Sequence, residues 1–135
     1  MSQTIKDDCV VNSKDKSDKH VDFVYHNDKK ITVVDYSNIK NEQIFINRIR
    51  KTTKYLAENE SDMLLVVNVS GSYGTSKIIY EMKKGGELIK PITKKSVVVG
   101  ITKTQLVFLK AVNMFSNLEM KPYYDCDEAK KYLIE

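Results

Sequence analysis

The sequence predicts an α/β fold in which helices pack on a mixed, mostly parallel sheet. Residues 63–69 form a continuous apolar run of strand length, which is typical of a strand buried on both faces. The small polar residues 70–76 follow at once and predict a tight turn into a helix. A second apolar run, at 96–101, is also followed by a helix-capping sequence, so the chain repeats the strand–helix order of a parallel sheet.

An antiparallel hairpin is predicted before these parallel strands. Val21, Phe23 and Tyr25 alternate with polar residues, as in a strand at or near the edge of a sheet. Turn residues occupy 26–30, and a second strand is expected over 31–36. The hairpin therefore forms the amino-terminal side of the sheet.

Two helices are predicted in the middle of the chain. The first is expected to begin after a cap at Ser37 or Asn38 and to end near residue 59, with the second running from about residue 75 to Pro91. Their apolar stripes have helical spacing: Phe45, Ile49, Thr52 and Leu56 in the first, and Ile79, Met82, Gly86 and Ile89 in the second. Gly86 lies on the buried stripe, which predicts a close approach of this helix to the sheet.

Two capping boxes predict the last two helices of the chain. Thr102 and Gln105 open a predicted helix to about residue 117, and Asp125 and Glu128 open a final helix after a short strand at 120–124. The inward-facing residues of the final helix are Ala129, Tyr132 and Leu133. The predicted order is ββαβαβαβα, and each strand–helix–strand step is long enough for a right-handed parallel crossover.

The 135 residues predict one domain over 20–135, preceded by a flexible arm over 1–19 with mixed charge. The two cysteines, Cys9 and Cys126, are too few and too far apart to indicate a disulfide framework or a metal site. The sequence shows neither a secretory signal nor an apolar run of the roughly 20 residues that span a bilayer. These observations predict a reduced, cytoplasmic protein.

The charged and titratable residues favour neither nucleic-acid binding nor catalysis. The net charge is +4, and residues 77–110 alone carry eight lysines and two glutamates. Few of these lysines alternate with exposed aromatics and arginine is scarce, so we expect solvated helix faces and no nucleic-acid partner. No carboxylate pair, metal-ligand spacing or nucleophile elbow occurs, and His20 and His26 are expected to be solvated. The sequence therefore predicts a non-enzymatic protein without a cofactor or metal.

Several motifs in the second half carry a family resemblance. They are Lys90-Pro91, the run Lys-Lys-Ser-Val-Val-Val-Gly-Ile-Thr over 94–102, the helix Leu-Val-Phe-Leu-Lys-Ala-Val-Asn-Met-Phe-Ser over 106–116, and an end with Tyr124-Asp125, Glu128-Ala129 and Tyr132-Leu133. In this order they resemble a bacterial family of small stand-alone STAS-like or STAS/SEC14-like proteins. The element order over 20–135 is similar to the STAS domain of sulfate transporters and anti-sigma-factor antagonists.

The resemblance implies a signalling module that acts by protein–protein binding, with a serine kinase or an anti-sigma factor as the kind of partner. In phosphorylation-switched STAS proteins, a partner kinase modifies a serine at the start of the second helix, and added charge there disrupts an interface. The corresponding candidates in this chain are Ser70, Ser72, Thr75 and Ser76. The turn departs from the Asp-Ser-Ser-Gly-Leu-Gly pattern of that class, since no acidic residue precedes the serine. A helix cap is the alternative role of each hydroxyl.

A second hypothesis is the binding of a small anionic or lipid-like molecule at the same edge of the sheet. The turn can hold a phosphate or carboxylate on backbone N–H groups, and the apolar helix over 102–117 is compatible with an apolar ligand. The residues of this candidate edge are Gly71, Tyr73, Gly74, Lys77, Thr102, Lys103 and Gln105. Burial or packing in a homodimer would also explain the apolar helix, and the sequence leaves these alternatives open.

Overall fold

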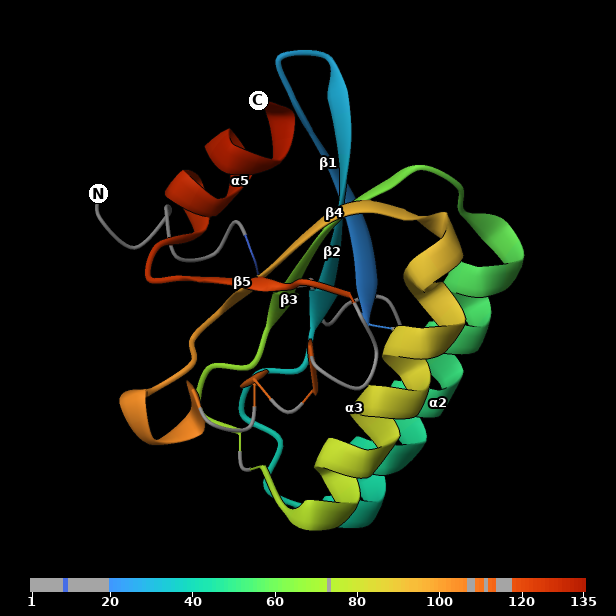
Figure 1. Ribbon diagram of the computed structural model, residues 1–135, viewed down its shortest axis with the longest axis vertical. Coiled ribbons are helices and arrows are strands. Elements are labelled where there is room, and N and C mark those ends of the chain that lie inside the picture. The colour runs from blue at the N-terminus through green and yellow to red at the C-terminus, as the bar shows by residue number, and fades with distance from the viewer. Residues whose placement is uncertain (1–8, 10–19, 73, 107–108, 111, 114–117) are drawn as a thin grey trace.

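A computed structural model describes residues 9, 20–72, 74–106, 109–110, 112–113 and 118–135. Its centre is one five-stranded sheet in which the strands lie in chain order (Figure 1). The first two strands are antiparallel and each later strand is parallel to its neighbour. The strands are β1 (Val21–His26), β2 (Lys29–Asp35), β3 (Met63–Asn68), β4 (Thr93–Val99) and β5 (Lys121–Tyr123). The predicted mixed sheet with an amino-terminal hairpin is confirmed.

Helices cover the two faces of the sheet unequally. The long helices α2 (Glu42–Asn59) and α3 (Ser76–Ile89) lie side by side on one face, and the short α5 (Cys126–Ile134) lies on the other (Figure 1). Two 3₁₀ turns, η2 (Lys90–Ile92) and η3 (Lys103–Gln105), interrupt the connections around β4. Leu106 and residues 109–110 and 112–113 are helical, and the rest of the helix predicted over 102–117 lies outside the described residues.

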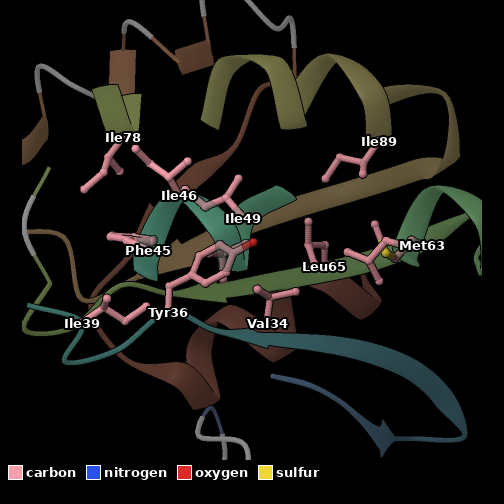
Figure 2. Close-up of a cluster of buried hydrophobic side chains, with 12 residues drawn as sticks. Val34, Tyr36, Ile39, Phe45, Ile46, Ile49, Met63, Leu65, Ile78 and Ile89 are labelled. Atoms are coloured by element: carbon pink, nitrogen blue, oxygen red, sulfur yellow. The ribbon is translucent and has the colours of Figure 1, made fainter. Parts of the chain in front are cut away.

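Alternation along the strands divides the core into two clusters. In β2 and β3, Val34 and Leu65 face the long helices, where Phe45 and Ile49 meet them (Figure 2). Val33, one residue before Val34, and Val66, one residue after Leu65, face α5 on the other side of the sheet. This period of two places apolar side chains on both faces, as expected of the central strands of a sheet covered on both sides.

The first long helix begins later than predicted. Its N-cap is Asn41, whose side chain accepts from the Ile44 N–H at 2.9 Å, so the expected cap at Ser37 or Asn38 is wrong. The Ser37 hydroxyl instead donates to Asp35 at 2.5 Å. Asn38 has φ +56° and its N–H donates to Ser70 O, so contacts with a neighbouring loop hold this segment out of the helix.

Gly85 of α3 lies close to a neighbouring helix, and the approach of Gly86 to the sheet stays a prediction. A Cβ at Gly85 would lie 2.7 Å from Thr53 Cγ2, on the neighbouring α2. Gly85 therefore allows α2 and α3 to pack closely, which offsets a helix-propensity cost of about 1 kcal/mol. The predicted end of this helix at Pro91 is confirmed, because α3 passes into η2 at Lys90.

The two cysteines form a disulfide, so the prediction that they are reduced and separate is wrong. Cys9 and Cys126 are 117 residues apart in the chain, yet their Cα atoms are 6.1 Å apart. Cys9 is 1% exposed and packs among the residues between the sheet and α5. The rest of the predicted arm over 1–19 lies outside the described residues. Within the described part of the chain, no helix has the length and apolar character to cross a membrane.

Candidate functional site

Three loops leave the carboxyl ends of β2, β3 and β4 and lie against one another. The Asn38 N–H donates to Ser70 O at 2.8 Å, which joins the first two loops. The Val69 N–H donates to Val99 O at 3.0 Å, which joins the second and third. Since the carboxyl ends of parallel strands are the usual binding edge of an α/β sheet, these loops form the candidate site. We call it the carboxyl edge.

Two glycines permit this close contact between loops. Gly71 has φ +74° and lies against Asn38, and Gly100 has φ +87° and lies against Ser70. A Cβ at either position would collide with the neighbouring loop, and the positive φ would add strain. The backbone of the carboxyl edge is therefore fixed by its neighbours.

Ser72 is buried in the carboxyl edge and hydrogen-bonds to both neighbouring loops. Its side chain is 5% exposed, its hydroxyl donates to Tyr36 O, and it accepts from the Ile39 N–H at 2.8 Å. Gln105 reaches the same point from the third loop, where its Nε2 donates to Ser72 O at 3.0 Å. These bonds give Ser72 a structural role that the sequence pattern did not distinguish from a phosphoacceptor role.

The start of α3 presents the accessible hydroxyl groups. Thr75 is the N-cap: its hydroxyl accepts from the Ile78 N–H at 3.3 Å and donates to Glu42 Oε2 at 2.5 Å. Ser76 and Lys77, in the first turn of α3, are exposed. Ser70 is exposed on the preceding turn. Tyr73 lies outside the described residues.

The third loop completes the carboxyl edge with a capping box. The Gln105 Oε1 accepts from the Thr102 N–H at 3.1 Å, which confirms the predicted capping sequence. Thr102 and Lys103 are exposed there. The structure therefore brings the described candidate residues of the sequence analysis to one edge, with Ser72 buried inside it.

The carboxyl edge is also connected to the amino-terminal segment through Asn68. The Asn68 side chain donates to Cys9 O at 3.1 Å and accepts from the Ser70 N–H at 3.0 Å. The disulfide of Cys9 to Cys126 holds this contact in place. No motif in the sequence indicated this connection, because it joins segments distant in the chain.

The polar residues of the hairpin take structural positions. Asp35 accepts from the Ser37 N–H at 2.9 Å and so caps the turn after β2. The backbone O of His20 accepts from the Asp35 N–H at 3.0 Å, whereas His26 pairs with Lys29 at the opposite end of β2. Among the described residues, no three His, Cys, Asp or Glu side chains form a group that could hold a metal ion.

An apolar cavity of about 110 Å³ lies between the sheet and the helices on the side of α3. Val67 and Val98 line it from the sheet, and Met82 and Gly86 line it from α3. Protein interiors contain few voids larger than a water molecule. This pocket is partly open to solvent, and lining residues such as Ile79 and Met82 are half-buried. No pattern in the sequence indicated this cavity.

An ion pair between α2 and α3 was also missed by the sequence analysis. Arg50 donates to both Glu81 oxygens, with Nε–Oε2 at 3.1 Å and Nη2–Oε1 at 2.7 Å. The pair lines a polar groove beside Ser76, Lys77 and the exposed Tyr80. Arg50 is on the exposed face of its helix, so helical spacing alone could not identify its partner on another helix.

We expect acid to weaken the protein through this pair. The hydrogen bonds from Arg50 hold the pKa of Glu81 below its ordinary value of 4.5. A carboxyl group with a lowered folded-state pKa stabilises the fold at pH values above its unfolded-state pKa, and this stabilisation is lost as the pH falls through the folded-state pKa. Urea unfolding between pH 7 and pH 3 should therefore show a steeper loss for the wild type than for Glu81→Gln. Parallel curves for the two proteins would contradict a coupled Arg50–Glu81 pair.

The fold of this chain is similar to that of a solved structure. A crystal structure of an uncharacterized protein from the DUF3478 family with a SpoIIAA-like fold, from Shewanella loihica PV-4, is similar to this chain with a TM-score of 0.62. The likeness covers 84% of this chain and 91% of that chain, at 14% sequence identity. No family model and no curated protein matches the chain. The SpoIIAA-like fold is STAS-like, so the predicted fold is confirmed.

Proposed function

From the STAS-like fold of this chain, we propose a non-enzymatic regulatory module that binds a partner protein at the carboxyl edge and is switched by phosphorylation of Ser76. The observation that carries the proposal is the contrast between Ser72, which is buried and hydrogen-bonded inside the loop after β3, and Ser76, which is exposed at the start of α3. The cross-links hold the loop backbone, and Ser76 remains accessible to a kinase. A serine kinase or an anti-sigma factor is the kind of partner proposed.

The surface beside Ser76 suits reversible protein binding. Lys77 is exposed next to it, and Tyr80 is 60% exposed one helical turn further along α3. Tyrosine side chains are enriched at the centres of protein interfaces, and polar side chains surround these centres at the rim. A phosphate on Ser76 adds nearly two negative charges, which α3 tolerates at its amino end but an apposed interface does not.

Affinity capture from an extract of the host cell tests the proposal. The wild type, Ser76→Ala, Ser76→Asp and Lys77→Glu are compared, with Ser61→Asp as a control on the opposite edge of the sheet, before β3. We expect the same protein to be retained by the wild type, Ser76→Ala and Ser61→Asp, and to be lost with Ser76→Asp and Lys77→Glu. A phosphate mapped to Ser76 in protein isolated from the host would support the switch. Identical protein sets from all five baits would contradict docking at the carboxyl edge.

The cytoplasmic location stays a prediction. The Cys9–Cys126 disulfide does not favour it, because disulfides persist in oxidising compartments. Thiol trapping of the chain in intact host cells measures this directly. Two free thiols would support a reducing cytoplasm, and a retained disulfide would contradict it.

A further inference from the structure

We propose that the Cys9–Cys126 disulfide is a redox switch for the carboxyl edge, and that its reduction by a dithiol loosens the loop after β3. Three observations carry the proposal: the position of the disulfide between the sheet and α5, a hydrogen-bonded path from Cys9 to that loop, and the buried state of the amide group on this path. The loosening of the loop goes beyond the proposed partner binding, and only its effect on a partner rests on that function.

The disulfide attaches Cys9 to the helix that covers the second face of the sheet. Cys9 is 1% exposed and packs in the same cluster as Val33 and Val66, and Cys126 is the first residue of α5. The two cysteines are 117 residues apart in the chain. Reduction therefore turns a covalent link between distant segments into a packing contact between two small thiol side chains.

A path of hydrogen bonds leads from Cys9 to the carboxyl edge. The Asn68 Nδ2 donates to Cys9 O at 3.1 Å, and the Asn68 Oδ1 accepts from the Ser70 N–H at 3.0 Å. Ser70 O in turn accepts from the Asn38 N–H at 2.8 Å, so the path ends in the loop after β2. One side-chain amide thus binds Cys9 with one end and the loop after β3 with the other.

The burial of the Asn68 amide makes this path sensitive to Cys9. Asn68 is 5% exposed, and in the described part of the chain no buried side-chain nitrogen or oxygen lacks a hydrogen-bond partner. A buried donor that loses its acceptor is unfavourable. When reduction lets Cys9 move away, the Asn68 side chain turns toward another acceptor or water, and its bond to the Ser70 N–H is lost.

The reduction is a thiol–disulfide exchange with a dithiol. One thiolate of the dithiol attacks the Cys9 Sγ, the S–S bond breaks, and Cys126 leaves as a thiolate that takes up a proton. Cys126 is the better leaving group, because the N–H groups at the start of α5 favour its thiolate. The second thiol of the reductant then releases Cys9, so two electrons and two protons pass to the cysteines and the dithiol becomes a disulfide. Since both cysteines are buried, the exchange is slow and responds to a lasting change in redox state.

Hydrogen exchange measured by NMR on the full chain, oxidised and in dithiothreitol, tests the switch. After reduction the Ser70 N–H should exchange about tenfold faster, as expected for the loss of one hydrogen bond, and the Asn68 side-chain amide resonances should shift. The Thr102 N–H is the matched control, because it donates to Gln105 Oε1 at the same edge, and its exchange rate should not change. Equal acceleration of both amides would show a general loss of stability and overturn the proposal, as would an unchanged Ser70 N–H. Loss of all protection in β4 on reduction would also overturn it, since the bond would then hold the whole fold.

Matched variants separate the path from the bond. Asn68→Ala keeps both cysteines but has no side-chain amide, so its Ser70 N–H should exchange at the fast rate in both redox states. Asn59→Ala is the control, because the Asn59 amide bonds only within α2 at 2.8 Å to Tyr55 O, and this variant should keep the redox response of the wild type. The Cys9→Ala/Cys126→Ala double variant should show fast exchange at Ser70 with and without dithiothreitol. A redox response that persists in Asn68→Ala, or one that appears in the double variant, would overturn the proposal.

Partner capture by the oxidised and the reduced wild type is a separate readout. A redox-dependent Ser70 N–H in a chain that captures no partner would support the switch and contradict the proposed function alone. A captured partner together with a redox-independent Ser70 N–H would overturn the switch alone.

Discussion

Loss of the Cys9–Cys126 disulfide should lower the free energy of unfolding by about 3–5 kcal/mol. The bond closes a loop across 117 residues, and closing so long a loop strongly restricts the unfolded chain. The bond also holds Cys9 between the sheet and α5, a face covered by a helix of only nine residues. The effect is therefore expected to be among the largest of any single change in this protein.

Urea unfolding measures this loss in three states: the oxidised wild type, the wild type in dithiothreitol, and the Cys9→Ala/Cys126→Ala double variant. The reduced wild type and the double variant should have similar midpoints, both well below that of the oxidised protein. Dithiothreitol should leave the double variant unchanged, which controls for effects of the reductant. Equal midpoints in all three states would show that the bond does not stabilise the fold. In a reducing compartment, the chain would have the stability of the double variant.

Truncation of Phe45 to alanine should cost about 3–5 kcal/mol. The ring is 2% exposed and lies 5.4 Å from the ring of Tyr36, centroid to centroid, in the cluster between α2 and the sheet (Figure 2). Phe45 also lines the apolar pocket beside α3, so its removal would enlarge that pocket. The surroundings are therefore poorly placed to collapse and compensate.

The control is Ile44→Ala, one residue earlier on the same helix. Ile44 is 52% exposed, and its truncation should change stability by less than about 0.5 kcal/mol. Thermal and urea unfolding of the two variants measure the difference. Similar losses for both would contradict the assigned inner face of α2.

The local elements could be predicted because their signals lie within a few residues of one another. The apolar run of β3 and the alternation of the hairpin are properties of short segments, and both are confirmed. The cap at Asp125 and the capping box at Thr102 are confirmed for the same reason, since a cap joins a side chain to an N–H group two or three residues away. The chain order of these elements was enough to predict a mixed, STAS-like sheet.

Such local patterns could not predict contacts between segments that are distant in the chain. Asn38 could cap a helix in isolation, but it meets Ser70 in the folded chain, and the cap passes to Asn41. Gly85 lies against Thr53, which belongs to another helix. Arg50 and Glu81, like the two cysteines, became partners only when packing brought their segments together.

The sequence by itself determined the strands, most of the helix limits and the edge at which the candidate residues gather. Hydrogen bonding to near neighbours and the periodicity of apolar side chains are local, so they can be read from the chain. Only the tertiary structure decided that Ser72 is buried while Ser76 is exposed, that Cys9 meets Cys126, and that a cavity lies beneath α3. Burial, pairing and voids depend on which surfaces meet in space, and the packing of the whole domain sets them.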